Sequence, residues 1–226
     1  MPFPELRARV SEIQTRISNA ASRGGHGQSV TIVAVTKTHG ADAVDAAFGA
    51  GLKDVGENKV QEALTKQPLV HSAVRWHLIG HLQRNKVKAL EHFSLFHAVD
   101  SPRLADAIDA WAQPRGTAMN VLVQVNVKGE ETKGGHSLEE LEREAARLKT
   151  LAGLNVVGAM TMAPFDAPEK TLRECFAGAR QARAILNSAG HPATELSMGM
   201  SGDYEIAVEE GATLVRLGTI LFGART

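Results

Sequence analysis

Short apolar runs alternate with amphipathic, helix-like stretches eight times along this chain, and this alternation constrains the fold more than any other feature. The runs cover residues 30–37, 54–58, 75–80, 96–100, 120–127, 156–162, 195–198 and 213–219. Because each run is short and is followed by a helical pattern, we expect parallel strands joined by helices. Eight such units predict a closed (β/α)8 TIM barrel.

An open, doubly wound sheet is the alternative architecture. It is disfavoured because eight units are more than most open sheets contain, and because no Gly-x-Gly-x-x-Gly turn follows the first predicted strand. The chain has 226 residues, slightly fewer than the ~250 that are usual for a barrel of this type. Residues 1–226 are therefore interpreted as a single domain.

An extra helix is predicted before the first strand. Apolar residues recur there at steps of three and four, which places them on one helix face: Leu6, Val10, Ile13, Ile17 and Ala20. The glycine-rich segment 22–27 ends this helix, because glycines and polar residues in such a cluster do not continue a helical pattern.

Charge and composition disfavour several kinds of partner. Lys and Arg number 25 and Asp and Glu also 25, so the chain lacks the net charge that attracts nucleic acid or an anionic membrane surface. No run of about 18 apolar residues would cross a membrane, and the first residues do not resemble a secretory leader. The single cysteine, Cys175, indicates a packed helix position in a reducing compartment. We expect a cytoplasmic monomer.

Lys37 closes the first predicted strand. The two-residue period of a strand places it on the same face as Val33 and Val35. If that face lines the barrel, desolvation disfavours the ammonium form, and the neutral amine can attack an aldehyde to form a Schiff base. The alternative is that Lys37 leaves the strand for solvent, as most lysines do.

Two segments near the carboxyl terminus have features of a phosphate site. Residues 197–203 lead from the seventh strand into a helix, and Ser201 with Gly202 would let backbone N–H groups approach an anion. Gly218 and Thr219 follow the eighth strand. Barrels often bind phosphate in the loops after strands seven and eight, which favours this interpretation. A simple helix cap and a tight strand end are the alternatives.

Arg216 interrupts the apolar eighth run between Val215 and Leu217. A buried guanidinium needs a partner, which is either a neighbouring carboxylate or a ligand. A ligand would offer an acceptor such as an unprotonated ring nitrogen. An imine-forming lysine, a phosphate cradle and this arginine together point to pyridoxal 5′-phosphate (PLP).

Several longer motifs resemble those of the pyridoxal phosphate homeostasis protein family. They are residues 33–37, 56–62, 76–86, 160–164, 196–203, 215–219 and 222–223. The resemblance extends from the first strand to the carboxyl terminus. It implies one barrel similar to the amino-terminal domain of alanine racemase, with PLP attached to Lys37 as a Schiff base.

The same resemblance implies roles for individual residues. Ser201, Gly202, Gly218 and Thr219 would hold the phosphate, and Arg216 would face the pyridine nitrogen. The residues expected to contact the ring or its substituents are Asn58, His81, Met160 and Met198. Two positions depart from the family pattern, Lys59 and Arg84, and both are expected at the periphery of the pocket.

Members of the family are expected to bind and hand over PLP, with PLP-requiring apo-enzymes as possible recipients, rather than to turn over a substrate. Racemisation needs a proton donor on each face of the imine, typically a lysine and a tyrosine. The chain has one tyrosine, Tyr204, next to the predicted phosphate loop. An arginine at the ring nitrogen also weakens the ring as an electron sink. A PLP-dependent racemase or lyase of low activity is the alternative. Lys133, in a glycine-rich loop, is a second candidate to accept the aldehyde.

Two other classes of function remain as alternatives. In a Schiff-base phosphosugar aldolase, Lys37 would bind the substrate, and Glu57 or Asp100 would supply acid-base chemistry. Metal catalysis is suggested by nine histidines, but His77 and His81 share a strand face only if that strand continues past residue 80, and no His-Glu-x-x-His motif occurs. Three further histidines are expected in loops and not as metal ligands: His39, His97 and His136.

Overall fold

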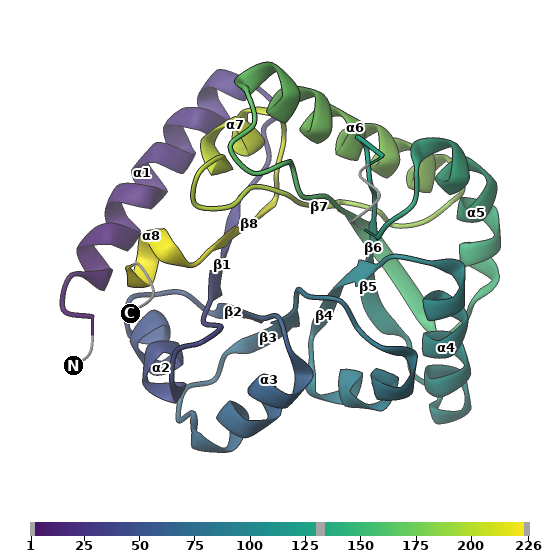
Figure 1. Cartoon of the computed structure of the whole chain (residues 1–226), viewed down its shortest axis with the longest axis horizontal. Coiled ribbons are helices and arrows are strands. Elements are labelled where there is room, and N and C mark those ends of the chain that lie inside the picture. Colours follow the sequence, from purple (N-terminus) through teal and green to yellow (C-terminus); the bar gives the residue numbers. More distant parts are fainter. Residues whose placement is uncertain (1–2, 130–133, 224–226) are drawn as a thin grey trace.

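Eight parallel strands form a closed barrel in the order β1 to β8 (Figure 1). The computed structural model describes residues 3–129 and 134–223. The strands are β1 Thr31–Val35, β2 Asp54–Glu57, β3 Arg75–Leu78, β4 Leu95–Val99, β5 Met119–Gln124, β6 Leu154–Met160, β7 Glu195–Ser197 and β8 Leu214–Leu217. Each lies within or overlaps one of the eight predicted runs. The predicted barrel is confirmed and the open sheet is excluded.

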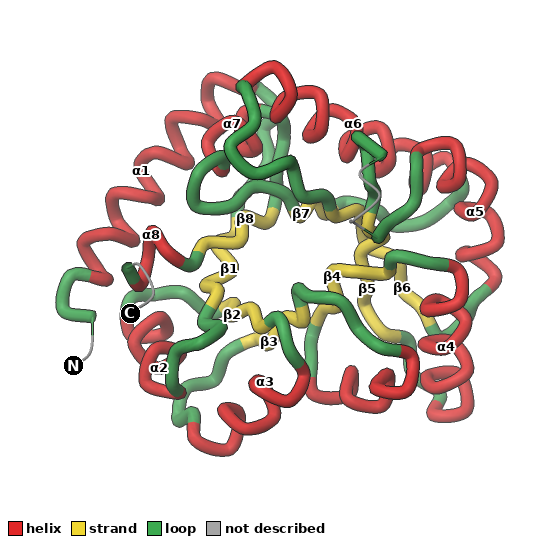
Figure 2. Tube along the Cα trace, in the orientation of Figure 1, coloured by secondary structure: helices red, strands yellow, loops and turns green. Residues whose placement is uncertain are grey.

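Helices form a ring outside the strands (Figure 2). They are α1 Leu6–Gly24, α2 Ala41–Gly49, α3 Val60–Lys66, α4 Pro102–Ala112, α5 Leu138–Thr150, α6 Glu169–Ser188, α7 Tyr204–Glu209 and α8 Thr219–Phe222. Short 3₁₀ helices cover Gln67–Leu69, Arg84–His92 and Gln113–Arg115. Within the described ranges, none of the helices is long and apolar enough to cross a membrane.

The predicted amino-terminal helix is present as α1. Its five apolar residues at steps of three and four are all buried. The helix ends at Gly24 and is capped by Gly25, whose φ of 68° is the left-handed conformation that glycine adopts without a steric penalty. The Gly25 N–H donates to the carbonyl of Ala21. The amphipathic pattern therefore predicted both the helix and the face that it buries.

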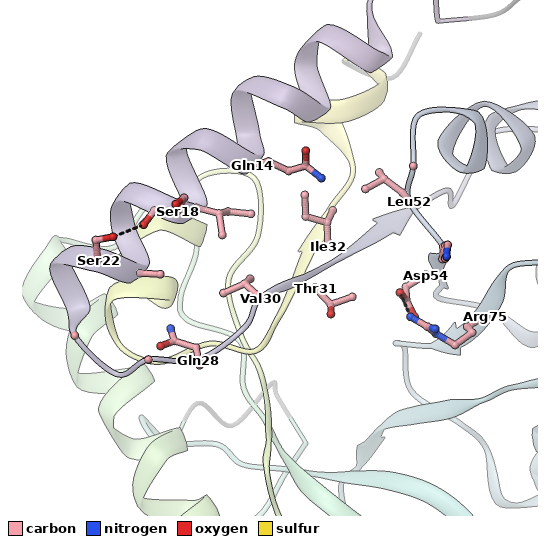
Figure 3. A pocket seen from close by; sticks show the side chains of 16 residues that line it. Gln14, Ser18, Ser22, Gln28, Val30, Thr31, Ile32, Leu52, Asp54 and Arg75 are labelled. Carbon is pink, nitrogen blue, oxygen red and sulfur yellow. Dashed lines mark hydrogen bonds and ion pairs between the residues drawn. The ribbon is translucent and has the colours of Figure 1, made fainter.

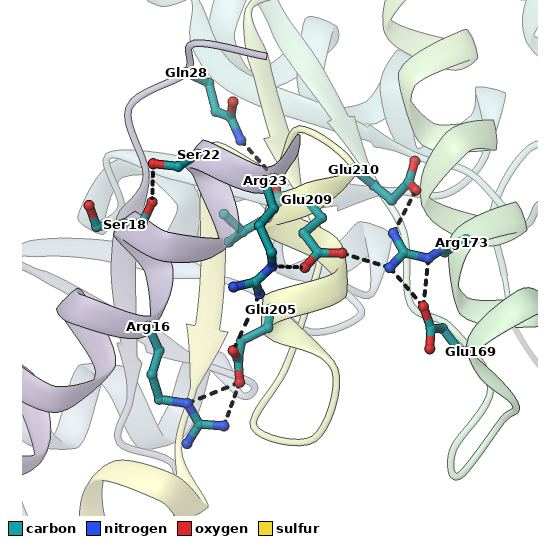
Figure 4. A network of polar contacts seen from close by, with 11 residues as sticks. Arg16, Ser18, Ser22, Arg23, Gln28, Glu169, Arg173, Glu205, Glu209 and Glu210 are labelled. Carbon is teal, nitrogen blue, oxygen red and sulfur yellow. Dashed lines mark hydrogen bonds and ion pairs between the residues drawn. The ribbon is translucent and has the colours of Figure 1, made fainter. Parts of the chain in front are cut away.

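Ion pairs join α1 to α7 and α7 to α6 on the outside of the barrel (Figure 4). Arg23 on α1 and Arg173 on α6 both contact Glu209 on α7, each at 2.6 Å. Arg16 on α1 contacts Glu205. These contacts matter for the site because α7 directly follows the predicted phosphate loop.

The barrel interior combines apolar and polar side chains. Val33 on β1 is fully buried, and it pairs in register with Asp54 on one side and with Arg216 on the other. His77, His97 and Ser197 are also buried. Barrels of this kind are usually filled by branched apolar residues, so a polar interior calls for an explanation from its hydrogen bonds.

Candidate functional site

A cavity of about 970 Å³ lies at the carboxyl ends of the strands, and eight of the ten predicted site residues line it. They are Lys37, Asn58, His81, Ser201, Gly202, Arg216, Gly218 and Thr219. These residues come from five segments of the chain, and the first and last of them, Lys37 and Thr219, lie 182 positions apart in the sequence. The structure thus brings the predicted set together, and their roles toward a ligand stay predictions.

Met160 and Met198 are not among the residues that line this cavity. Both are buried, with 1% and 0% of their surface exposed. Their strands end at Met160 and Ser197, and the cavity lies beyond the strand ends. For this reason Met162 and Met200, two positions further along the chain, line the cavity instead.

Lys37 is half-buried. It lies in a turn, because β1 ends at Val35 and not at Lys37 as the sequence predicted. Thr38, the next residue, has a φ of 69°. A β-branched residue rarely adopts this left-handed conformation, so surrounding contacts must hold it there.

Those contacts come from a cluster that we call the Lys66 clamp, formed by Thr36, Thr38, Glu57, Glu62 and Lys66. The buried Lys66 Nζ donates to the Thr36 carbonyl at 2.7 Å, to Glu57 Oε1 at 2.7 Å and to Glu62 Oε1 at 2.8 Å. Glu62 in turn accepts the N–H of Thr38. The clamp therefore fixes the residues on both sides of Lys37.

Glu57 is fully buried within this clamp and does not line the cavity. Burial raises its pKa, while hydrogen bonds from Lys66 and from the Thr36 hydroxyl oppose the rise. Glu57 thus forms a buried ion pair with Lys66, which is a structural role. The acid-base role that the aldolase hypothesis assigned to it has no support from this position.

The loops after β7 and β8 meet at one side of the cavity. Ser201 Oγ accepts the N–H of Ile220 at 3.4 Å and so joins the two loops. A Cβ atom built on Gly202 would meet no atom within 4 Å, which shows that this glycine leaves open space in the cavity. Hydroxyls and backbone N–H groups around such a space are suited to an oxyanion.

Asn58 reaches the cavity because Gly80 allows a close approach between the loops that follow β2 and β3. A Cβ on Gly80 would lie 2.3 Å from the Asn58 carbonyl oxygen. No side chain could be accommodated there without moving the backbone. Gly80 therefore fixes the position of Asn58, and both residues line the cavity.

Arg216 is 4% exposed and lines the cavity from β8. Its Nη1 donates to Ser197 Oγ at 2.5 Å and its Nη2 to the Thr161 carbonyl at 3.0 Å. Among the described residues, no carboxylate forms an ion pair with it; the charge of Asp203 acts on it only at longer range. Burial lowers the pKa of Arg216 to about 10, so the guanidinium is charged at neutral pH. The carboxylate partner considered from the sequence is absent from this part of the structure.

His81 lines the rim of the cavity next to an acidic residue. Its Nδ1 lies 2.7 Å from Asp100 Oδ2, and the Ser101 hydroxyl donates to the other oxygen of Asp100. The His81 side chain is 69% exposed, whereas Asp100 is mostly buried. This pair can accept and return a proton at the mouth of the cavity.

The other histidines correct or refine the sequence interpretation. His39 lies in a loop as expected, but His97 lies within β4 and is fully buried, and His136 is also buried. β3 ends at Leu78, so His77 and His81 do not share a strand face. Over residues 3–129 and 134–223, no group of three or more His, Cys, Asp or Glu side chains is arranged to hold a metal ion.

The remaining candidates lie away from the cavity. Lys59 and Arg84 are exposed and do not line it. Tyr204 is buried beneath the guanidinium of Arg16, 5.6 Å from the ring centroid, and does not line it either. Lys133 lies outside the described residues.

A second hollow, of about 730 Å³, lies at the opposite end of the barrel (Figure 3). It is lined by α1, by the start of β1 and by the ion pair of Asp54 and Arg75. No sequence motif marks this hollow, so it could not be predicted from the sequence.

Known proteins match the chain along almost its whole length. The family model for the N-terminal domain of alanine racemase matches residues 9–226, so the chain is a barrel protein of the alanine racemase type. The pyridoxal phosphate homeostasis protein of Aquifex aeolicus is 40% identical over 221 residues, which cover 96% of this chain and 97% of that protein. The one from Escherichia coli K12 is 37% identical, with coverage of 98% and 97%. The chain belongs to the pyridoxal phosphate homeostasis protein family, as its motifs indicated.

Solved structures agree with this assignment. PipY of Synechococcus elongatus is 36% identical, and the match covers 96% of this chain and 100% of that chain; the TM-score is 0.87 without PLP and 0.85 with PLP bound. Alanine racemase from Corynebacterium glutamicum, 15% identical with a TM-score of 0.71, shares the fold. There the match covers 94% of this chain but only 61% of the racemase chain.

Proposed function

We propose that this protein binds PLP in the cavity at the carboxyl ends of the strands, with Lys37 as the point of covalent attachment. The observation that carries the proposal is the convergence on one cavity of Lys37, an open glycine-lined space at Gly202, and the buried Arg216. The PLP-bound structure of a 36% identical relative supports it. PLP supplies an aldehyde that reacts reversibly with amines.

The described residues fit each part of that molecule. Ser201, Gly202, Gly218 and Thr219 would hold the phosphate, where two loops meet around open space. No carboxylate among the described residues forms an ion pair with Arg216, so it would donate to the unprotonated ring nitrogen. Asn58 and His81 would contact the ring or its substituents. Met162 and Met200 replace Met160 and Met198 in this proposal, because they line the cavity.

We further propose a role as a carrier or buffer of PLP that delivers it to PLP-requiring apo-enzymes. Lys37 would hold PLP through one reversible C=N bond, formed with loss of water, and a second amine can replace Lys37 in that bond. The charged Arg216 disfavours protonation of the ring nitrogen and so disfavours carbanion chemistry. The proposal includes a cytoplasmic location, which the single, buried Cys175 supports, and a monomer, because one barrel accounts for the amphipathic helix faces.

A second candidate function is a weak PLP-dependent racemase or lyase activity. The pair of His81 and Asp100 favours it, because it places a proton-transfer group at the mouth of the cavity. Exchange of the α-hydrogen of an amino acid for deuterium, followed by mass spectrometry in wild type and His81→Gln, would detect this chemistry. Exchange that persists unchanged in His81→Gln would reject His81 as the proton donor.

The test of the main proposal is a titration with PLP followed by absorbance, in wild type, Lys37→Met and Lys59→Met. The account expects saturable binding in wild type and in the Lys59 variant, and loss of the Schiff-base absorbance in the Lys37 variant. The loaded wild-type protein should then activate a PLP-requiring apo-enzyme. Equal absorbance changes in all three proteins would reject the assignment of Lys37.

A further inference from the structure

A chain of hydrogen bonds crosses the interior of the barrel and ends at Arg216. Asp54 Oδ1 lies 3.0 Å from His77 Nε2, and His77 Nδ1 lies 2.9 Å from His97 Nε2. His97 Nδ1 lies 2.8 Å from Ser197 Oγ, which accepts a hydrogen bond from Arg216 Nη1. We call this chain the polar spine; it consists of Asp54, His77, His97, Ser197 and Arg216.

The polar spine is buried along its whole length. His97 and Ser197 are 0% exposed, and the other three members are each 4% exposed. Burial of so many polar groups is costly unless each is hydrogen-bonded. Both ring nitrogens of each histidine have a hydrogen-bond partner within the spine, so these hydrogen bonds offset the free-energy cost of burying the polar groups. Apolar residues at these positions would be sufficient for packing. The unbroken series of hydrogen bonds therefore indicates a role beyond packing.

The charged ends determine the direction of these hydrogen bonds. Arg216 can only donate, so Ser197 Oγ is an acceptor for it. Burial raises the pKa of Asp54, but hydrogen bonds from His77 and Arg75 outweigh this and leave that pKa below its usual value. Asp54 is therefore a carboxylate, and His77 Nε2 must carry a hydrogen. Burial, together with the charges of His77 and Arg216, lowers the pKa of His97 well below its usual value, so His97 is neutral.

One hydrogen on each imidazole ring allows only one direction. His77 Nδ1 is then a bare acceptor, so His97 must donate from Nε2, and the Ser197 hydroxyl must donate to His97 Nδ1. All the donors then point from Arg216 toward Asp54, and the direction imposed by Asp54 extends to Ser197, the residue that holds Arg216.

Charged groups lie at both ends of the spine. Arg75, whose side chain is 59% exposed, donates to Asp54 from Nε at 2.7 Å and from Nη2 at 2.5 Å. Both residues line the second hollow, where Figure 3 shows their contact. At the other end, Asp203 is the acidic group whose charge acts on Arg216, and burial raises the pKa of Asp203.

We infer that Ser197, His97, His77 and Asp54 are positioning residues that orient Arg216 at the PLP cavity. This inference rests on the proposed function for the part that concerns PLP. None of these four residues lines that cavity. They would act on the ring nitrogen only through Arg216, and would affect PLP binding without touching the cofactor.

The first test uses the PLP-free protein. Nitrogen-15 NMR of the histidine rings distinguishes the nitrogen that carries hydrogen from the bare one. The inference expects the hydrogen of each ring on Nε2, for His77 because Asp54 accepts it and for His97 because His77 Nδ1 accepts it. A hydrogen on His97 Nδ1 at neutral pH would overturn the inference. This result is independent of PLP, so it stands or falls separately from the proposed function.

The second test measures PLP affinity and the absorbance of the bound PLP. Ser197→Ala should weaken binding about tenfold, because Arg216 loses a neutral acceptor that orients it. His77→Gln should weaken binding by a smaller factor, and both variants should shift the absorbance, because Arg216 is less firmly oriented at the ring. His191→Gln is the matched control: His191 is also buried, but its Nε2 contacts the Ala145 carbonyl outside the spine. Weaker binding in the control, or wild-type affinity and absorbance in both spine variants, would contradict the inference.

Discussion

Gly202 gives the sharpest prediction at the scale of a single residue. No atom lies within 4 Å of the Cβ that Gly202→Ala would add, so the variant should fold with wild-type stability. The new methyl group would enter the space proposed for the phosphate, and we expect PLP to bind about tenfold more weakly, which corresponds to about 1.4 kcal/mol. Titration with PLP and unfolding in urea measure the two quantities.

Gly49→Ala is the control for this change. Gly49 lies in α2, and a Cβ there also meets no atom within 4 Å. This variant should gain up to about 1 kcal/mol of stability, because alanine favours a helix, with unchanged PLP affinity. Equal PLP affinity in Gly202→Ala and wild type would show that the phosphate does not lie against Gly202.

Single residues also show how far the sequence could predict the site. Lys37 and Arg216 were predictable because each places a charge at the end of an apolar strand or within one. Their supporting contacts were not. Ser197 and Thr161 hold Arg216 from positions 19 and 55 residues away, and only the closure of the barrel brings them together. Met162 and Met200 were missed because the extent of each strand decides which methionine reaches the cavity.

The Lys66 clamp gives a prediction at the scale of elements, because it ties α3 and β2 to the turn that carries Lys37. Lys66→Met would leave the fully buried Glu57 without its cation. Loss of one partner of a buried ion pair typically costs about 3–5 kcal/mol, and we expect a loss of this size in urea unfolding. PLP binding should also weaken, because Thr36 loses its contact with α3.

The double variant Lys66→Met/Glu57→Gln separates these effects. Removing both charges should restore much of the stability, since no charge is then left buried and unpaired. PLP binding should stay weak in the double variant, because the contact between Lys66 and the Thr36 carbonyl is still missing. If restored stability brought back full PLP affinity, the clamp would contribute to folding and not to the position of Lys37.

The elements themselves were largely predictable, because eight apolar runs leave few arrangements for a chain of this length. The boundary of β1 was not. The sequence continued the strand to Lys37, but Lys66 holds the Thr36 carbonyl and Thr38 adopts a φ of 69°, so the strand ends at Val35. The cause is a side chain 30 residues away, which a local pattern cannot show.

At the scale of the whole molecule, the ion pairs between α1, α7 and α6 predict how stability depends on pH (Figure 4). Hydrogen bonds from Arg173 and Arg23 lower the pKa of Glu209. The stabilisation is therefore present above the unfolded-state pKa of about 4.3 and is lost as the pH falls through the lower pKa of the folded state. Because Arg173 and Arg23 are partly exposed to solvent, we expect this stabilisation to be no more than about 1 kcal/mol.

Urea unfolding of wild type and Glu209→Gln at a series of pH values tests this dependence. The variant should be less stable than wild type at pH 7, by about 1 kcal/mol, and the two should converge as the pH approaches about 3. A constant difference between them down to the lowest pH would contradict the assignment. It would mean that the ionisation of Glu209 contributes nothing to the contact between α7 and its neighbours.

The covalent attachment of PLP to Lys37 is the claim on which the account depends most. Reduction of the PLP-loaded protein with borohydride would make the bond permanent, and peptide mass spectrometry would locate it. We predict one adduct, on the peptide that contains Lys37, with Lys59 unmodified. An adduct on another lysine, or an unmodified Lys37 at saturating PLP, would contradict it.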